Sequence, residues 1–415
     1  MLSTFLPVRP QLQALQEEAT SLFDDCLADN PNALYDWNMF AERQFNRNIC
    51  TIEDARNVVA RGYGLSTWSR LELACVVTDS IWRGDSGTLI STISQSPYLL
   101  HEDARGVRGN WGPPLSYAAT VGDENLVKAL LEMGARDIQY AFDRATLKGH
   151  LSIAELLHSR GAIPERGCIM GPCETLNADG LRYLLSAGSA VEDHNGNPLA
   201  PLGLVLQTYS RNPEGKHACL ALLQDAGCNL PESPPMAVHA GRIDLLEQHA
   251  RRDPDMLNRR FSHAEIFPIE LGCDSDETLA LHGTPLAGTT LLHMAVDYDE
   301  FQIAEWLLER GANVDQPAII DSDGFGGHTP LYGTVVSQPF RVGLRLDNSM
   351  AQLLLDAGAK PHTRASLRKR LRFVDDETLH EYPNVTPSEW GRLFHDQSWV
   401  SPTALALIDA AATVR

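Results

Sequence analysis

The sequence lacks long apolar runs. None of its apolar stretches approaches the ~20 residues that a membrane-spanning helix needs. Residues 1–10 also lack a basic stretch followed by an uninterrupted apolar run, so no secretory signal is expected. We therefore expect a cytoplasmic protein that does not bind membranes.

Cysteine is sparse, because eight cysteines are scattered over 415 residues and no two have the Cys-x-x-Cys spacing. A disulfide framework or a zinc ribbon would place them closer together. The spacing predicts reduced and mostly buried thiols. We expect neither a metal nor a cofactor, since the chain also lacks glycine-rich phosphate loops and the Gly-x-Ser-x-Gly motif of hydrolases.

Positive charge is in short supply as well. The chain has 34 Lys and Arg against 54 Asp and Glu, which gives a formal net charge of −20. Such a surface repels nucleic acid and anionic lipid, and it favours a protein partner with a basic or neutral surface. The basic run within residues 364–372 has helical spacing, and we expect it to lie on a solvated helix at the end of the fold.

The sequence does contain a motif that recurs at the ends of its expected helices. A leucine pair is followed by two or three residues, a glycine and a small residue, and the pattern closes at Gly134, Gly161, Gly188, Gly227, Gly311 and Gly358. Paired leucines pack a helix inward, and glycine just past the helix permits the left-handed turn that ends it. Repetition at this scale indicates a stack of helix pairs.

Matching helix starts precede several of these endings, as in Pro114-Leu115-Ser116-Tyr117-Ala118-Ala119 and Thr329-Pro330-Leu331-Tyr332. The order of residues resembles the ankyrin repeat, with the best copies at 110–137, 288–315 and 326–359. The resemblance implies an all-α ankyrin-repeat solenoid with helical caps at both ends. We expect about eight helix-pair units, near residues 74–105, 106–138, 139–163, 168–190, 195–230, 233–259, 287–316 and 324–361.

The two ends differ from the repeats. Residues 51–68 resemble a helical segment that precedes the array in many bacterial ankyrin-repeat proteins. We therefore divide the chain into an N-terminal helical capping segment (1–73), the array (74–361) and a C-terminal helical cap (362–415). An insertion at about 260–287 is long enough to fold over one face of the array.

The residues that could have a catalytic role also have structural explanations. The family resemblance implies that His293 hydrogen-bonds backbone between neighbouring loops, and we expect no catalytic residues. Asp297, Asp323, His328 and His282 lie close together in sequence and could form a cluster of histidines and carboxylates. The preferred explanation is that these side chains hydrogen-bond backbone groups in turns and at helix caps.

The resemblance also implies a concave groove lined by finger loops and by outward positions of the first helices. Aromatic residues mixed with arginine and methionine are typical anchors of protein interfaces. The predicted binding residues are Trp111, Tyr117, Thr120, Arg144, Leu147, Met294, Asp297, Tyr298, Phe325, His328 and Tyr332.

The sequence thus favours a protein–protein interaction scaffold that binds a protein partner in this groove and has no catalysis of its own. One alternative is an enzyme whose groove holds a small-molecule site under the insertion at 261–287. Another is a secreted effector or an immunity-type binding protein.

Overall fold

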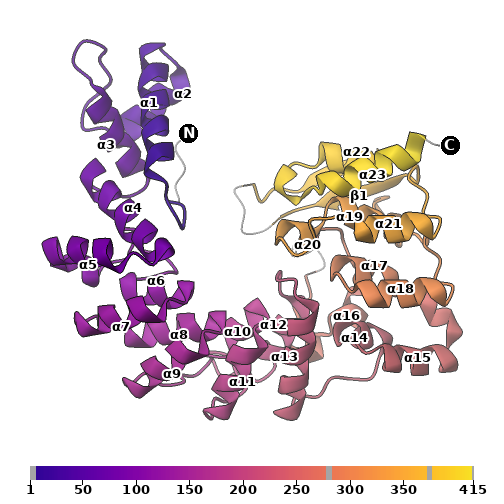
Figure 1. Ribbon diagram of the computed structural model, residues 1–415. Helices are drawn as coiled ribbons and strands as arrows, with labels where there is room; N and C mark the ends of the chain where they lie inside the picture. The colour runs from indigo at the N-terminus through magenta and orange to yellow at the C-terminus, as the bar shows by residue number, and fades with distance from the viewer. Residues whose placement is uncertain (1–5, 277–282, 372–375, 414–415) are drawn as a thin grey trace. The chain divides into compact units, whose positions relative to one another are not determined.

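The computed structural model describes residues 6–276, 283–371 and 376–413, so His282 and Arg372 lie outside the described residues. The described part is all-α apart from a two-stranded sheet, which confirms the predicted fold class. It forms two compact units, residues 1–163 (unit 1) and 164–415 (unit 2), each of which is described by itself. Unit 1 runs from indigo to magenta in Figure 1, and unit 2 runs from magenta to yellow.

Unit 1 is helical throughout its regular structure. Its elements are α1 (Leu12–Leu27), α2 (Pro31–Phe40), α3 (Ile52–Gly62), α4 (Trp68–Arg83), α5 (Ser86–Gln95), η1 (Pro97–Leu100), α6 (Pro114–Val121), α7 (Glu124–Glu132), α8 (Ile138–Lys148) and α9 (Leu151–Ser159).

Unit 2 continues with helices and adds the sheet near its end. Its elements are α10 (Met170–Thr175), α11 (Ala178–Ser186), α12 (Ala200–Gln207), α13 (Pro213–Asp225), α14 (Pro234–His239), α15 (Ile243–Arg252), η2 (Pro254–Leu257), α16 (His263–Ile266), η3 (Ile269–Leu271), α17 (Leu291–Asp297), α18 (Phe301–Glu309), α19 (Tyr332–Val335), α20 (Gln338–Arg341), α21 (Ser349–Asp356), β1 (Ala365–Lys369), β2 (His380–Val385), α22 (Pro387–Leu393), η4 (Gln397–Trp399) and α23 (Pro402–Thr413).

The described residues contain eight helix pairs at the predicted places, from α4 with α5 to α19 with α21. In unit 1 the first helices α4, α6 and α8 pack against one another in series and form an inner layer (Figure 1). The second helices α5, α7 and α9 form an outer layer. Gly84, Gly122 and Gly149 end the three inner helices in the left-handed conformation, where a side chain would be strained.

The N-terminal helices of unit 1 share one hydrophobic core with the first helix of the array. Leu15, Leu22 and Trp37 of α1 and α2 pack with Val58 of α3 and Leu71 of α4 in one hydrophobic cluster. A capping box begins α3. The Thr51 side chain accepts the backbone N–H of Asp54, and the Asp54 side chain accepts the backbone N–H of Thr51. The first repeat is therefore continuous with this segment through α4.

The finger loops of unit 2 are joined edge to edge. Neighbouring fingers exchange backbone hydrogen bonds at Phe261 with Thr289, at Ile319 with Gly288 and at Gly326 with Ser366. The described part of the insertion packs on two helix pairs, since η3 contacts α12 and α16 contacts α14. The described part of the insertion therefore lies against the first helices of two pairs in unit 2.

The C-terminal cap differs from the prediction of a purely helical segment. Residues 365–369 of the basic run form β1, which pairs antiparallel with β2, and only then do α22 and α23 follow. Ala365, Leu367 and Lys369 are buried while the residues between them are partly exposed, which is a strand period. The predicted solvated helix in this run is therefore wrong. No helix in the described ranges is both long and apolar enough to cross a membrane.

Candidate functional site

The predicted binding residues fall into two groups. Four of them, Trp111, Arg144, Leu147 and Phe325, keep part of their surface exposed. The expectation that the side chains face outward is wrong for the other seven, which are buried: Tyr117, Thr120, Met294, Asp297, Tyr298, His328 and Tyr332.

The reason is that other parts of the chain cover these positions. Tyr117 donates its hydroxyl hydrogen to the carbonyl of Val8, and Tyr332 donates to the carbonyl of Val385 at 2.6 Å. Both acceptors come from the terminal segments, which lie far from the repeats in sequence. A repeat pattern places a side chain on a helix but does not show what covers it.

Asp297 and Tyr298 belong to a buried ionic cluster in unit 2. The carboxylate of Asp297 pairs with the Arg211 guanidinium at 2.7 Å, and both side chains are buried. Lys216 lies 2.7 Å from the Nδ1 atom of His239, and its ammonium lies 3.5 Å from the centroid of the Tyr298 ring. Burial lowers the pKa of Lys216 well below its usual range and raises the pKa of Tyr298.

This cluster lies close to the insertion, where the enzyme alternative would place its site. His239 contacts the carbonyl of Ile266 at 3.0 Å through Nε2, and Gly283 donates its N–H to Asp297 at 3.3 Å. These contacts join side chains of the cluster to one another and to backbone, which is how buried polar groups are stabilised. The cluster therefore has a structural use, and a small-molecule site there has no support from these contacts.

His293 has the structural role that the resemblance implied. Its Nδ1 atom lies 2.9 Å from the Thr290 hydroxyl, and its Nε2 atom lies 3.1 Å from the carbonyl of His328. His328 in turn contacts the carbonyl of Pro285 at 3.0 Å. The exposed Asp323 pairs with Arg368 instead, so the contacts of these residues do not assemble the cluster considered from the sequence. No group of three or more His, Cys, Asp or Glu among the described residues could hold a metal ion.

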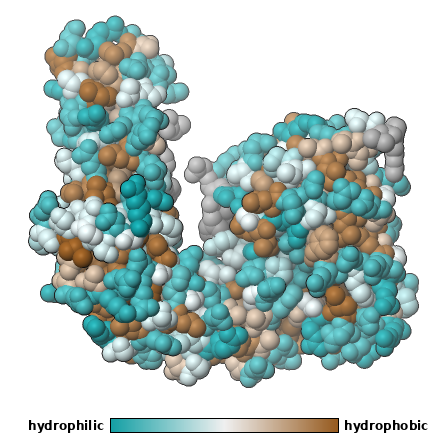
Figure 2. Space-filling view, viewed as in Figure 1, coloured by the Kyte–Doolittle hydropathy of each residue, from teal (hydrophilic) through white to brown (hydrophobic). Residues whose placement is uncertain are grey.

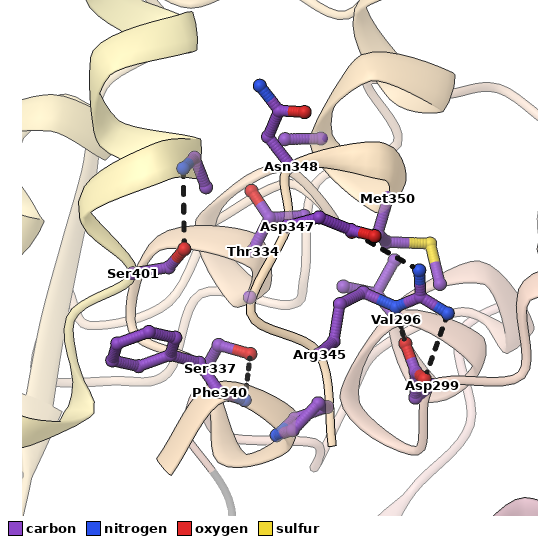
Figure 3. Close-up of a pocket in the computed structure, with 14 residues that line it drawn as sticks. Val296, Asp299, Thr334, Ser337, Phe340, Arg345, Asp347, Asn348, Met350 and Ser401 are labelled. Carbon is purple, nitrogen blue, oxygen red and sulfur yellow. Dashed lines mark hydrogen bonds and ion pairs between the residues drawn. The ribbon is translucent and has the colours of Figure 1, made fainter. Parts of the chain in front are cut away.

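One small cavity lies between α17, α19, α21 and the start of α23 (Figure 3). Its volume is about 20 Å³, which is room for a single water molecule. The Arg345 guanidinium points across it toward Asp299, to which it donates at 3.1 Å, and toward Asp347 at 3.4 Å. This cavity is an internal ion-pair site and is too small for a substrate.

Two wider hollows lie on unit 2. One of about 670 Å³ is lined by α13, α14 and α15, and one of about 530 Å³ is lined by α12 and by Glu270 and Leu271 of the insertion. The titratable residues that line the second hollow are Glu270 and Cys228. Burial raises the pKa of the Cys228 thiol, which makes it a poor nucleophile.

The most distinctive surface feature is a cluster of aromatic side chains on the inner layer of unit 1. We call it the aromatic face; it consists of Trp82 on α4, Trp111 on the finger before α6, Tyr117 on α6 and Tyr140 on α8. The ring centroids of Trp82 and Trp111 are 5.9 Å apart, and those of Trp111 and Tyr117 are 4.7 Å apart. Trp82 is 38% exposed and Tyr140 is 36% exposed, so the face remains accessible at both ends.

Arginines flank the aromatic face. The Arg144 guanidinium lies 5.5 Å from the centroid of the Trp111 ring and donates to the Thr120 hydroxyl at 3.0 Å. Burial, followed by repulsion from Arg144, lowers the pKa of Lys148 one helical turn further along α8. Cations stacked on aromatic rings and half-buried large rings are typical of protein-binding hot spots.

Sequence reasoning missed Trp82 and Tyr140. A signal for Trp82 was present, because it stands two residues before the glycine that ends its helix, as Thr120 and Leu147 do. Tyr140 carried no such signal. On the face that Figure 2 shows, hydrophobic and hydrophilic residues are interspersed, so hydropathy alone singles out no docking surface there.

Comparison with known proteins supports the repeat assignment. The ankyrin-repeat family model matches residues 287–319, which include α17 and α18. Solved structures that the chain matches include the human ASB11 ankyrin repeat domain, at 18% identity over 71% of this chain and 97% of that one, with a TM-score of 0.26. Another is an ankyrin repeat domain from Acinetobacter baumannii AYE, at 20% identity over 41% of this chain and 94% of that one, with a TM-score of 0.28.

No curated protein matches the chain. The family match, the eight helix pairs of the described residues and the finger contacts of His293 agree with one another. Residues 287–319 therefore form an ankyrin repeat, and the helix pairs of the described residues have the order that a stack of such repeats requires.

Proposed function

We propose that the chain is a non-catalytic scaffold that binds a protein partner on the aromatic face of unit 1. Ankyrin repeats are in general protein–protein interaction modules, which supports a binding role. The observation that carries the proposal is the cluster of half-exposed Trp82, Trp111 and Tyr140 with Arg144 stacked on it. Rigid aromatic rings bury much surface on binding and lose little conformational entropy.

Three partly exposed residues among the sequence predictions, Trp111, Arg144 and Leu147, lie on unit 1 and complete the proposed surface. Phe325 lies on unit 2, where the Arg368 guanidinium is 5.0 Å from its ring centroid, and it stays a separate predicted binding residue. The net charge of −20 favours a partner with a basic or neutral surface. The cysteines of the described residues form no disulfide and most of them are buried, which favours a reducing compartment such as the cytoplasm.

The test is to capture the partner from native cells by cross-linking, to purify it, and to measure its affinity for single variants. Trp111→Ala and Arg144→Ala should each weaken binding by about 1–3 kcal/mol, because both remove an anchor. Tyr35→Ala is the matched control, since Tyr35 is an aromatic residue on α2 with 59% of its surface exposed. Unchanged affinity in both anchor variants, with folding intact, would rule out this surface.

A further inference from the structure

The aromatic face already carries a segment of the chain itself. We call Leu6–Pro10, the residues that lead into α1, the strap. The Arg105 guanidinium donates to the carbonyl of Leu6 at 2.7 Å, and the Tyr117 hydroxyl donates to the carbonyl of Val8. Two backbone carbonyls of the strap are therefore held by side chains of the first two repeats.

The strap also places a cation on the face. The Arg9 guanidinium lies 5.8 Å from the centroid of the Trp82 ring and donates to Asp79 at 2.7 Å. Trp82 donates its indole N–H to the Tyr117 hydroxyl at 3.0 Å, and that same hydroxyl donates to the strap. The indole, the phenol and the strap carbonyl thus form one continuous chain of hydrogen bonds.

These contacts define the chemistry that the face recognises. The aliphatic side chain of Leu6 is 2% exposed and is buried in the hydrophobic cluster of the N-terminal helices, and Arg9, three positions later, lies over Trp82 of the face. Unit 1 also supplies two hydrogen-bond donors to the backbone between them. Pro7 and Pro10 restrict the backbone of the strap, which lowers the entropy that is lost when such a segment binds.

The strap is held in a way that allows exchange. The Arg9 side chain is 42% exposed, and exposed ion pairs contribute little to stability. Asp79 has a second partner in Arg83 at 2.8 Å, so its carboxylate stays paired when Arg9 leaves. An incoming aliphatic side chain would replace the burial of Leu6.

We infer that the strap occupies, within the same chain, a peptide-binding site on the aromatic face. A partner segment that displaces it carries an aliphatic residue followed three positions later by arginine. This inference rests on the proposed function and adds its regulation, because the strap and the partner exclude each other. The partner can bind only those molecules in which the strap has left the site. The apparent affinity is therefore the intrinsic affinity multiplied by the fraction of molecules in which the site is open.

The probe is a fluorescent, acetylated and amidated peptide of residues 6–11 (Leu-Pro-Val-Arg-Pro-Gln), titrated by anisotropy. A variant that lacks residues 1–10 should bind it saturably and at least 10-fold more tightly than the full chain does. The same peptide with glutamate at the arginine position is the matched control and should bind at least 5-fold more weakly. Asp79→Asn in the truncated variant should reduce that discrimination.

Because Leu6 belongs to the hydrophobic cluster, a second variant guards against misfolding. Arg9→Glu in the full chain breaks the ion pair with Asp79, and it should raise the affinity for the peptide about 5-fold over the natural chain. Absence of peptide binding by a folded open variant, or equal binding by the natural chain, would overturn the inference. Loss of partner binding in the Trp111 and Arg144 variants, combined with failure of the peptide experiment, would support the proposed function without the strap.

Discussion

His293 and His328 join two neighbouring fingers as neutral side chains. Each uses a ring nitrogen to contact a backbone carbonyl, and each is almost completely buried. Burial lowers the pKa of His293 to about 3 and the pKa of His328 to about 4. Protonation of either ring would place an unpaired charge between the fingers.

The stability of the fold should therefore fall in mild acid. The unfolded imidazoles have a pKa near 6.5, so between pH 6.5 and about 4 the unfolded chain binds more protons than the folded chain. Stability is complete above pH 6.5 and is lost as the pH falls below it. We expect a loss of about 2 kcal/mol per imidazole between pH 6.5 and pH 5, measured by urea unfolding.

His328→Gln provides the control, because glutamine keeps a polar side chain that does not titrate in this range. Its free energy of unfolding should be lower at pH 7 but should depend less steeply on pH. An equally steep dependence in this variant would assign the acid sensitivity to other groups.

At this scale the sequence predicted a role for His293 but not the burial of Tyr117, Tyr298 and Tyr332. His293 lies in a local motif whose geometry repeats from copy to copy. The three tyrosines are covered by residues distant in sequence, such as Val8 over Tyr117, and no local pattern reports such contacts.

At the scale of elements, two glycines test how the turns support the aromatic face. Gly112, before α6, has φ 73°, and a Cβ there would lie 2.5 Å from the Tyr140 ring. Gly134, after α7, has φ 94° and would place its Cβ in open space. Both positions are strained for alanine, but only the first forces an aromatic side chain to move.

Gly134→Ala should cost about 1–2 kcal/mol of unfolding free energy, which is the strain of the left-handed backbone alone. Gly112→Ala should cost more and should also weaken binding of the partner, since Tyr140 must shift. The measurements are urea unfolding and partner affinity on both variants. Equal stability and equal affinity in the two variants would show that Tyr140 moves aside freely.

The helix pairs were predictable because leucine spacing and terminal glycines are local signals. The β1–β2 hairpin was not, because its basic residues also fit a helical spacing. Its strand conformation depends on a distant partner, since Ser366 pairs with Gly326 of the last finger. A strand that forms because it pairs with a distant segment cannot be predicted from the local spacing of its residues.

At the scale of the whole molecule, the N-terminal helices seal one end of a stack. Leu71, Ala74 and Cys75 of α4 are buried in the cluster that includes Val58 and Val59 of α3. Stability in repeat proteins is roughly a sum over neighbouring units, and an uncovered end leaves an apolar face in water.

Removal of residues 1–66, up to the residue before the N-cap of α4, should therefore cause aggregation and lower the melting temperature. Size-exclusion chromatography with light scattering and thermal melts would measure both effects. The variant that lacks residues 1–10 serves as the control and should stay monomeric. A monomeric long truncation with an unchanged melting temperature would identify residues 1–66 as an independent domain.

The C-terminal cap contains a two-stranded sheet whose outer strand, β2, is poorly suited to strand exchange. The β1 strand is occupied on both sides, by Gly326 of the last finger and by β2. The β2 strand contains Pro383, which has no N–H to donate, and Asn384, whose φ of 52° bends the backbone. Such an edge is a poor template for a strand from another molecule. The hairpin thus prevents the row of joined fingers from propagating into a polymer of identical chains.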